Sequence, residues 1–285
     1  MPKNETYKFA NHKLYEELKD DVGKISLNND LTTSALFSKK LSCNAFISNR
    51  EDIIVCGESF IVKFLKEKFQ NLKCTSNYND GDLVKKNSIL IELSGDVRWI
   101  LLLERTLLNF LQHLSSISTY TKKFVEKLNG SKTMLLDTRK TTTGLRVLEK
   151  YATKVGGAKN HRMGLNDKIL IKDNHIKVIG GIKKTLELIK KKKIKNFQIE
   201  CDSYSEVKKC IDYNCGHILL DNMPIKEIKK CLMLRKELGK KIIFEVSGGI
   251  NLENVIHYSK LDIDYISTSK ITNSVKSVDI GLDII

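Results

Sequence analysis

Residues 136–175 read LDTRKTTTGLRVLEKYATKVGGAKNHRMGLNDKILIKDNH, and this stretch decides the fold of the chain. Two short apolar strands frame a helical pattern over 144–155, and α/β proteins place binding residues where such strands end. Five cationic residues lie at or near these two strand ends: Arg139, Lys140, His161, Arg162 and Lys172. Arg presents planar paired donors that suit carboxylate or phosphate, and Lys presents a compact charge. The stretch therefore predicts a pocket for an anion.

The same alternation of strand and helix continues toward the end of the chain. The strands read TMLLDT (133–138), KILIK (168–172), FQIEC (197–201), HILLD (217–221), KIIFEVS (241–247) and DYIST (264–268). Such alternation predicts right-handed βαβ units and a parallel sheet, and the short apolar strands suit a sheet covered on both faces. Polar residues recur where each strand ends, which favours an α/β barrel with its site at that end.

The later strand ends add acids and small residues to the cations. Glu200 and Asp221 end neighbouring strands, where carboxylates hold Mg²⁺ through water or bind sugar hydroxyls. Ser247–Gly249 and Ser267–Ser269 predict a phosphate cradle. The pattern contains no nucleophile with a partner base, so chemistry here would depend on positioning and charge stabilisation.

The first part of the chain predicts a separate α+β module. Strands are expected within 41–57, a helix over 58–69 and a hairpin at Asp80-Gly81. A long helix is expected from about Val97 to Leu128, with Asp96 as its N-cap and Asn129-Gly130 as its stop. We therefore expect two domains, an N-terminal domain over 1–130 that includes this connecting helix and a barrel domain over 131–273.

Composition narrows the class of protein. The 285 residues are 41% hydrophobic, enough for a folded core, and the longest apolar runs are too short to span a membrane. The polar start, MPKNETYKFANHK, lacks a signal-peptide core, so a cytoplasmic location is expected. Seven cysteines without a C-x-x-C pair indicate reduced thiols rather than a zinc site. The net charge of +15 is spread over many lysines, and the run Lys190–Lys193 suits a helix end.

Residues 137–176 resemble the core signature of the quinolinate phosphoribosyltransferases, also called carboxylating nicotinate-nucleotide pyrophosphorylases. Further motifs of that family occur in order along the chain: DLTT (30–33), ERTLLNFLQHLS (104–115), IECDS (199–203), ILLDNM (218–223), FEVSGGI (244–250) and YISTS (265–269). The resemblance implies synthesis of nicotinate mononucleotide, pyrophosphate and CO₂ from quinolinate and phosphoribosyl pyrophosphate, with Mg²⁺, in NAD biosynthesis. It implies an N-terminal α/β sandwich and an incomplete, seven-stranded α/β barrel, with residues from about 274 to 285 returning to the N-terminal domain.

The resemblance also implies roles for individual residues. Quinolinate would be held by Arg105, Thr138, Arg139, Lys140, His161, Arg162 and Lys172. Glu200 and Asp221 would contact the ribose and Mg²⁺, and Ser247, Gly248, Gly249, Ser267, Thr268 and Ser269 would cradle the 5′-phosphate. Arg105 would reach the site of a neighbouring subunit, which requires at least a homodimer and leaves a hexamer, as a trimer of dimers, open. Neither nucleic acid nor a membrane is expected as a partner.

Four positions depart from the family pattern, and three alternatives stay open. Thr143 stands where Pro is usual, Asp202 where Glu is commoner and Asn273 where His is common. Ser269 replaces a usual Gly, and its Cβ would hinder close approach of a phosphate. The alternatives are a paralogue related to molybdenum-transport proteins, a nicotinate-specific transferase, and a basic nucleic-acid-binding protein with steeply salt-dependent binding.

Overall fold

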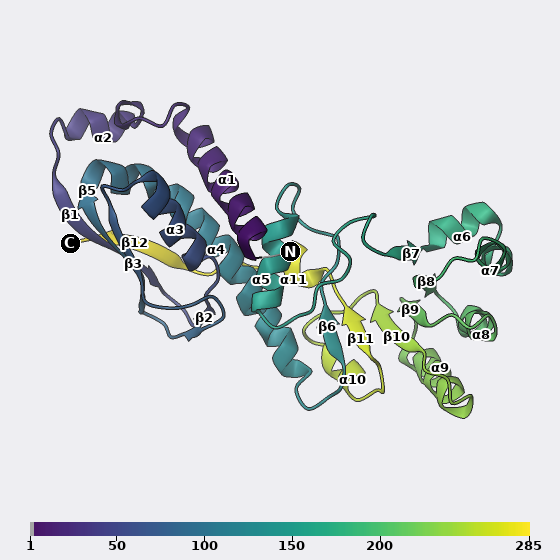
Figure 1. Cartoon of the computed structure of the whole chain (residues 1–285). Coiled ribbons are helices and arrows are strands. Elements are labelled where there is room, and N and C mark those ends of the chain that lie inside the picture. The colour runs from purple at the N-terminus through teal and green to yellow at the C-terminus, as the bar shows by residue number, and fades with distance from the viewer. Residues whose placement is uncertain (1–2) are drawn as a thin grey trace. The chain divides into compact units, whose positions relative to one another are not determined.

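The computed structural model of the protein describes residues 3–285 (Figure 1). Contacts divide the chain into two compact units. Unit 1 contains the described residues up to Lys122 together with 142–157 and 274–285, and unit 2 contains 123–141 and 158–273. The segment 142–157, expected from the sequence in the barrel domain, thus groups with unit 1. The physical reason is apolar packing, because Leu148 and Ala152 share a buried cluster with Tyr7, Ala10 and Phe60.

Unit 1 is built on a four-stranded antiparallel sheet with the order β12-β1-β5-β3. Its strands are β1 (Ser42–Asn49), β3 (Lys73–Ser76), β5 (Ile89–Asp96) and β12 (Ile280–Ile284), and β2 (Ile53–Ile54) pairs separately with β4 (Leu83–Val84). The helices are α1 (Lys3–Val22), η1 (Leu27–Asn29), α2 (Leu31–Leu36), α3 (Glu58–Lys68), α5 (Arg146–Val155) and the greater part of α4 (Val97–Lys127). The sheet thus joins the last strand of the chain to the first.

The long helix is confirmed, with the predicted residues at its ends. The Asp96 side chain accepts a hydrogen bond from the Arg98 backbone N–H at 3.1 Å, and Gly130 adopts φ +80° beyond the last turn. The Asp80-Gly81 hairpin prediction is wrong, because β3 pairs with β5 and β4 pairs with β2. Asp80 instead uses its carboxylate to accept hydrogen bonds from the Gly57 N–H at 2.7 Å and the Tyr151 hydroxyl at 2.7 Å.

Unit 2 contains a six-stranded parallel sheet with the order β6-β11-β10-β9-β8-β7, which confirms the predicted α/β fold. The strands are β6 (Met134–Leu136), β7 (Ile169–Ile171), β8 (Phe197–Cys201), β9 (His217–Asp221), β10 (Ile243–Ser247) and β11 (Tyr265–Ser267). The helices are α6 (Asp173–Ile179), α7 (Ile182–Lys191), α8 (Tyr204–Asp212), α9 (Ile225–Glu237), α10 (Val255–Ser259) and α11 (Lys270–Asn273). Figure 1 shows the strands as one row from β7 to β6, so the barrel is open between these two edges.

A short segment adds a seventh position beside β6. Lys159 forms a parallel bridge with Leu136, and its N–H donates to the Leu135 carbonyl at 2.8 Å. The central strands β8, β9 and β10 are buried along most of their length, as parallel strands between covering layers are. Because all strand pairs of this sheet are parallel, the carboxyl ends of its strands lie at the same edge of the incomplete barrel.

None of the helices that the structure describes has both the length and the apolar character needed to cross a membrane.

We expect Glu58→Gln to stabilise the protein in alkaline but not in acidic solution. Glu58 lies fully buried at the start of α3, and burial raises its pKa to about 7 from an ordinary 4.5. Because the folded protein binds this proton more tightly than the unfolded chain, wild-type stability falls as the pH rises from 4.5 to 7. Urea unfolding should therefore show the variant more stable by roughly 1–3 kcal/mol at about pH 8.5 and equal to wild type at about pH 4. An equal difference at both pH values would contradict this account.

Candidate active site

The predicted site residues of unit 2 gather around a cavity of about 360 Å³ at the carboxyl ends of the strands. They come from the segments after β6, β7, β10 and β11, from the end of β9 and from the loop before β7. The predicted residues that line it are Thr138, Arg139, Lys140, His161, Arg162, Lys172, Asp221, Ser247, Gly248, Gly249, Ser267, Thr268 and Ser269. Parallel strands converge at this edge, which is why residues far apart in the sequence share one cavity.

The cationic side of the cavity is crowded. Arg162 is buried, and both its burial and the nearby charge of Arg139 lower the pKa of its guanidinium. Arg162 Nη1 donates to the Lys168 carbonyl at 3.0 Å, which holds the guanidinium in place. Lys172 Nζ lies 2.6 Å from Glu200 Oε2. Like charges brought together at a partly desolvated site suit a multiply charged anion.

A buried acid holds the His161-Arg162 loop against the end of β6. Asp137 is fully buried, and its carboxylate accepts hydrogen bonds from the His161 N–H at 2.8 Å and from Asn160 Nδ2 at 2.6 Å. The Arg162 N–H in turn donates to His161 Nδ1 at 2.7 Å. Asp137 was not predicted as a site residue, although its place in the DTRK motif at a strand end was a usable signal.

The two predicted acids occupy different places. Asp221 lies on the cavity wall and accepts a hydrogen bond from Asn222 Nδ2 at 2.6 Å, whereas Glu200 is buried on β8, paired with Lys172. Within the described part of the chain, no group of three or more His, Cys, Asp or Glu side chains forms a metal cage. Mg²⁺ is usually held by one or two carboxylates together with substrate phosphates. Of the two acids, Asp221 lines the cavity and Glu200 does not, because its carboxylate is held by Lys172.

The turn after β10 leaves room for an anion. Gly248 has φ +91° and Gly249 has φ +65°, which side chains rarely adopt. A Cβ at Gly248 would lie 2.2 Å from Asn222 Oδ1, whereas a Cβ at Gly249 would meet no atom within 4 Å. Thr268 Oγ1 donates to the Ile250 carbonyl at 2.9 Å and ties the next strand end to this turn. Close packing behind the turn and open space before it are the geometry of an anion cradle.

Two further observations complete the placement of the predicted residues. Arg105 lies on α4 in unit 1, where its side chain is 63% exposed and 3.7 Å from Glu104 Oε1. Asn222, Glu245 and Lys270 also line the cavity and were not predicted. Glu245 had a signal in the sequence, because it is a lone carboxylate in the apolar strand IIFEVS.

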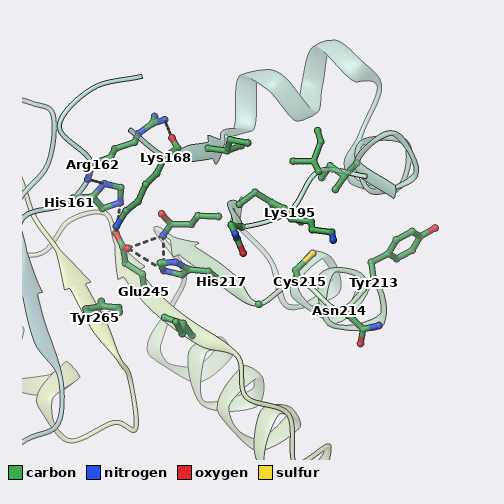
Figure 2. A pocket seen from close by; sticks show the side chains of 18 of the residues that line it. His161, Arg162, Lys168, Lys195, Tyr213, Asn214, Cys215, His217, Glu245 and Tyr265 are labelled. Atoms are coloured by element: carbon green, nitrogen blue, oxygen red, sulfur yellow. Dashed lines mark hydrogen bonds and ion pairs between the residues drawn. The ribbon is translucent and has the colours of Figure 1, made fainter. Parts of the chain in front are cut away.

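A second cavity, of about 1140 Å³, lies at the amino ends of the same strands (Figure 2). Its wall includes Lys168, Gln198, His217 and Tyr265, from the beginnings of their strands or just before. Although it is larger, α/β barrels carry their chemistry at the opposite end, where the cations and the cradle lie here. We therefore assign the candidate active site to the smaller cavity.

Comparisons with known proteins show the family to which the chain belongs. A family model of the quinolinate phosphoribosyltransferase C-terminal domain matches residues 117–283, and one of the N-terminal domain matches residues 30–115. A probable carboxylating nicotinate-nucleotide pyrophosphorylase of Methanocaldococcus jannaschii is 38% identical, over 95% of this chain and 96% of its own.

Solved structures show the same likeness. A nicotinate-nucleotide pyrophosphorylase of Ehrlichia chaffeensis is 38% identical with a TM-score of 0.88, covering 95% of this chain and 97% of its own. That of Francisella tularensis is 34% identical with a TM-score of 0.87, covering 98% and 97%. Sequence and fold thus agree along nearly the whole chain, which belongs to the quinolinate phosphoribosyltransferase family.

Proposed function

We propose that this protein transfers the phosphoribosyl group of phosphoribosyl pyrophosphate to quinolinate, with decarboxylation, to give nicotinate mononucleotide, pyrophosphate and CO₂ in NAD biosynthesis. The observation that carries the proposal is the pairing, in one cavity, of crowded cations at one side with a glycine cradle at the other. Relatives named as carboxylating nicotinate-nucleotide pyrophosphorylases support it.

The cations favour a diacid over a monoacid. Arg139, Arg162 and Lys172 bring two guanidiniums and one ammonium to the cavity, with Lys140 beside them. The two adjacent carboxylates of quinolinate would accept more of these charged donors than the single carboxylate of nicotinate. A nicotinate-specific transferase is therefore the weaker alternative.

The remaining residues suit the sugar phosphate. The turn at Gly248 and Gly249 would receive the 5′-phosphate through backbone N–H groups. Asp221 and Glu200 would contact the ribose hydroxyls and hold Mg²⁺ in part through water. When bound, Mg²⁺ would neutralise charge on the diphosphate.

Catalysis in this site would rest on binding and orientation. As the pyrophosphate departs, positive charge develops at C1 of the ribose, and the quinolinate nitrogen attacks C1 to form the new bond. The 2-carboxylate then leaves as CO₂, the electron pair stays on C2 beside the positively charged ring nitrogen, and a proton from water adds to C2 to complete nicotinate mononucleotide. Arg139 and Arg162 would orient the diacid and exclude water from its carboxylates.

The proposed homodimer is inferred from the position of Arg105. Its exposed side chain lies on α4 in unit 1, and we infer that it completes the diacid site of a second copy, so that the active form is at least a homodimer.

The decisive experiment measures pyrophosphate and ¹⁴CO₂ release from carboxyl-labelled quinolinate, with phosphoribosyl pyrophosphate and Mg²⁺. Wild type should release both, and Arg139→Ala should reduce both by about 10²-fold or more. Arg50→Ala, at an exposed arginine of unit 1, is the matched control and should react as wild type. If the protein reacts with nicotinate but not with quinolinate, it is a nicotinate-specific transferase and the diacid assignment is wrong. If it reacts with neither acid, the proposed function is refuted.

We expect Ser269→Gly to tighten binding of phosphoribosyl pyrophosphate. Ser269 lines the cavity, and its Oγ accepts a hydrogen bond from Asn273 Nδ2 at 3.4 Å, which holds the side chain near the cradle. Removing the Cβ would let a phosphate approach the backbone, lowering KM for phosphoribosyl pyrophosphate by roughly threefold, about 0.7 kcal/mol. A higher KM in steady-state kinetics would instead assign a donor role to the Ser269 hydroxyl.

A further inference from the structure

A buried carboxylate separates the two cavities of unit 2. Glu245 lies in the middle of β10, has no exposed surface, and lines both the candidate active site and the larger cavity behind it. An ionised carboxylate in such a place is costly unless neighbouring groups compensate it. The catalytic scheme above gives Glu245 no role.

Polar side chains surround this carboxylate, and Figure 2 shows His161 and His217 beside it. His161 Nε2 lies 3.6 Å from Glu245 Oε1, and His217 Nε2 lies 3.6 Å from Oε2. Gln198 Nε2 donates to Oε2 at 2.8 Å. Burial acts to raise the pKa of Glu245, but hydrogen bonds from His217, Ser267 and Gln198 and the charge of His161 together hold that pKa below its ordinary value.

The orientation of His161 is determined from both sides of its ring. Its Nδ1 accepts the Arg162 backbone N–H at 2.7 Å, so a neutral ring carries its proton on Nε2, the atom that faces Glu245. The His161 side chain is only 11% exposed, and the ring also lines the active-site cavity. Glu245 and the Arg162 N–H therefore select one tautomer and one ring position.

We propose that Glu245 is a positioning residue that acts on quinolinate binding through His161. This inference rests on the proposed function of the same cavity. The carboxylate fixes the imidazole as one wall of the diacid site, so His161 contributes shape and a fixed ring edge to the binding of the diacid. Loss of the Glu245 charge releases the ring, and binding of the diacid must then order it again.

The test is a double-mutant cycle with Glu245→Gln and His161→Asn, with His217→Asn as the matched control. Glu245→Gln, which keeps the side-chain shape, should raise KM for quinolinate about tenfold and leave KM for phosphoribosyl pyrophosphate unchanged. In the His161→Asn background the same substitution should change KM for quinolinate less than about twofold. His217→Asn removes a contact on the other side of Glu245 and should leave KM for quinolinate within about twofold of wild type.

The contact between Glu245 and His161 can also be measured by NMR spectroscopy, in the absence of substrate. Long-range ¹H–¹⁵N spectra report the protonation and position of the His161 ring, and Glu245→Gln should shift its ring signals. Equal losses from Glu245→Gln in both backgrounds, or from His217→Asn alone, would overturn the proposal and leave Glu245 a structural residue. If wild type does not use quinolinate, the proposed function and the role in substrate binding both fail. Unshifted His161 signals in an active Glu245→Gln variant would overturn the positioning role alone.

Discussion

Replacing Arg162 with methionine is expected to lower kcat/KM for quinolinate by about 10²–10⁴-fold. The guanidinium is buried in the candidate active site beside Arg139, and its Nη1 is held by the Lys168 carbonyl. A guanidinium donates two parallel hydrogen bonds to one carboxylate, whereas a lysine ammonium cannot. Arg162→Lys should therefore recover only part of the lost kcat/KM. Steady-state kinetics with quinolinate varied at saturating phosphoribosyl pyrophosphate measures both variants.

The same substitution should leave the stability of the substrate-free protein within about 1 kcal/mol of wild type. Burial and the charge of Arg139 both disfavour the charged form of Arg162 in the folded protein. The variant removes these two unfavourable effects and loses one favourable hydrogen bond, to the Lys168 carbonyl, so the changes offset each other. Quinolinate should raise Tm of wild type but not of Arg162→Met, because only the wild type binds it.

Arg235 in the same unit provides the contrast. It pairs with Asp264 Oδ2 at 2.7 Å and with Asp262 Oδ2 at 2.9 Å, and lies outside both cavities of unit 2. Arg235→Met should therefore lower stability by roughly 1–2 kcal/mol, mainly through its lost hydrogen bonds, and leave KM for quinolinate unchanged. If Arg162→Met were instead the more destabilising change, the assignment of Arg162 to substrate binding would lose its basis.

Local patterns in the sequence predicted the parallel sheet of unit 2 well. Each of its strands is short, apolar and followed by a helix, and this arrangement has few topological solutions. Pairing in unit 1 was harder, because an antiparallel sheet joins strands by contacts that no local pattern records. Asp80-Gly81 has the composition of a hairpin turn, yet β3 and β4 on either side pair with different strands. The pairing of β12 with β1 joins the last strand to the first, and no local pattern in the sequence indicates it.

Strand-end reasoning located the cavity because the carboxyl ends of parallel strands converge. It missed Asp137 and Glu245, whose partners are visible only after folding. Glu245 stands alone in an apolar strand, while His161, His217 and Gln198 come from a loop and two other strands. Residues that bind a ligand directly follow rules of position, whereas residues that support them depend on three-dimensional packing.

Gly248→Ala is expected to have the second large effect, on both stability and phosphate binding. The Asn222 N–H donates to the Ser247 carbonyl at 2.9 Å, which brings the ends of β9 and β10 together behind the turn. A Cβ on Gly248 would lie 2.2 Å from Asn222 Oδ1 and 2.8 Å from Asn222 N, in a backbone conformation with φ +91°. We expect a loss of about 2–4 kcal/mol in the free energy of unfolding, because the turn must move and residue 248 is strained.

Displacing this turn should also lower kcat/KM for phosphoribosyl pyrophosphate by at least about 10²-fold, since a small misplacement of a binding group has that effect. Gly249→Ala is the matched variant, because its φ of +65° carries a similar backbone cost but its Cβ meets no protein atom within 4 Å. It should lose only about 1 kcal/mol of stability while raising KM for phosphoribosyl pyrophosphate about tenfold, since its methyl would occupy the space left for the phosphate. An unchanged KM in Gly249→Ala would place the phosphate elsewhere and leave Gly248 a residue of the fold alone.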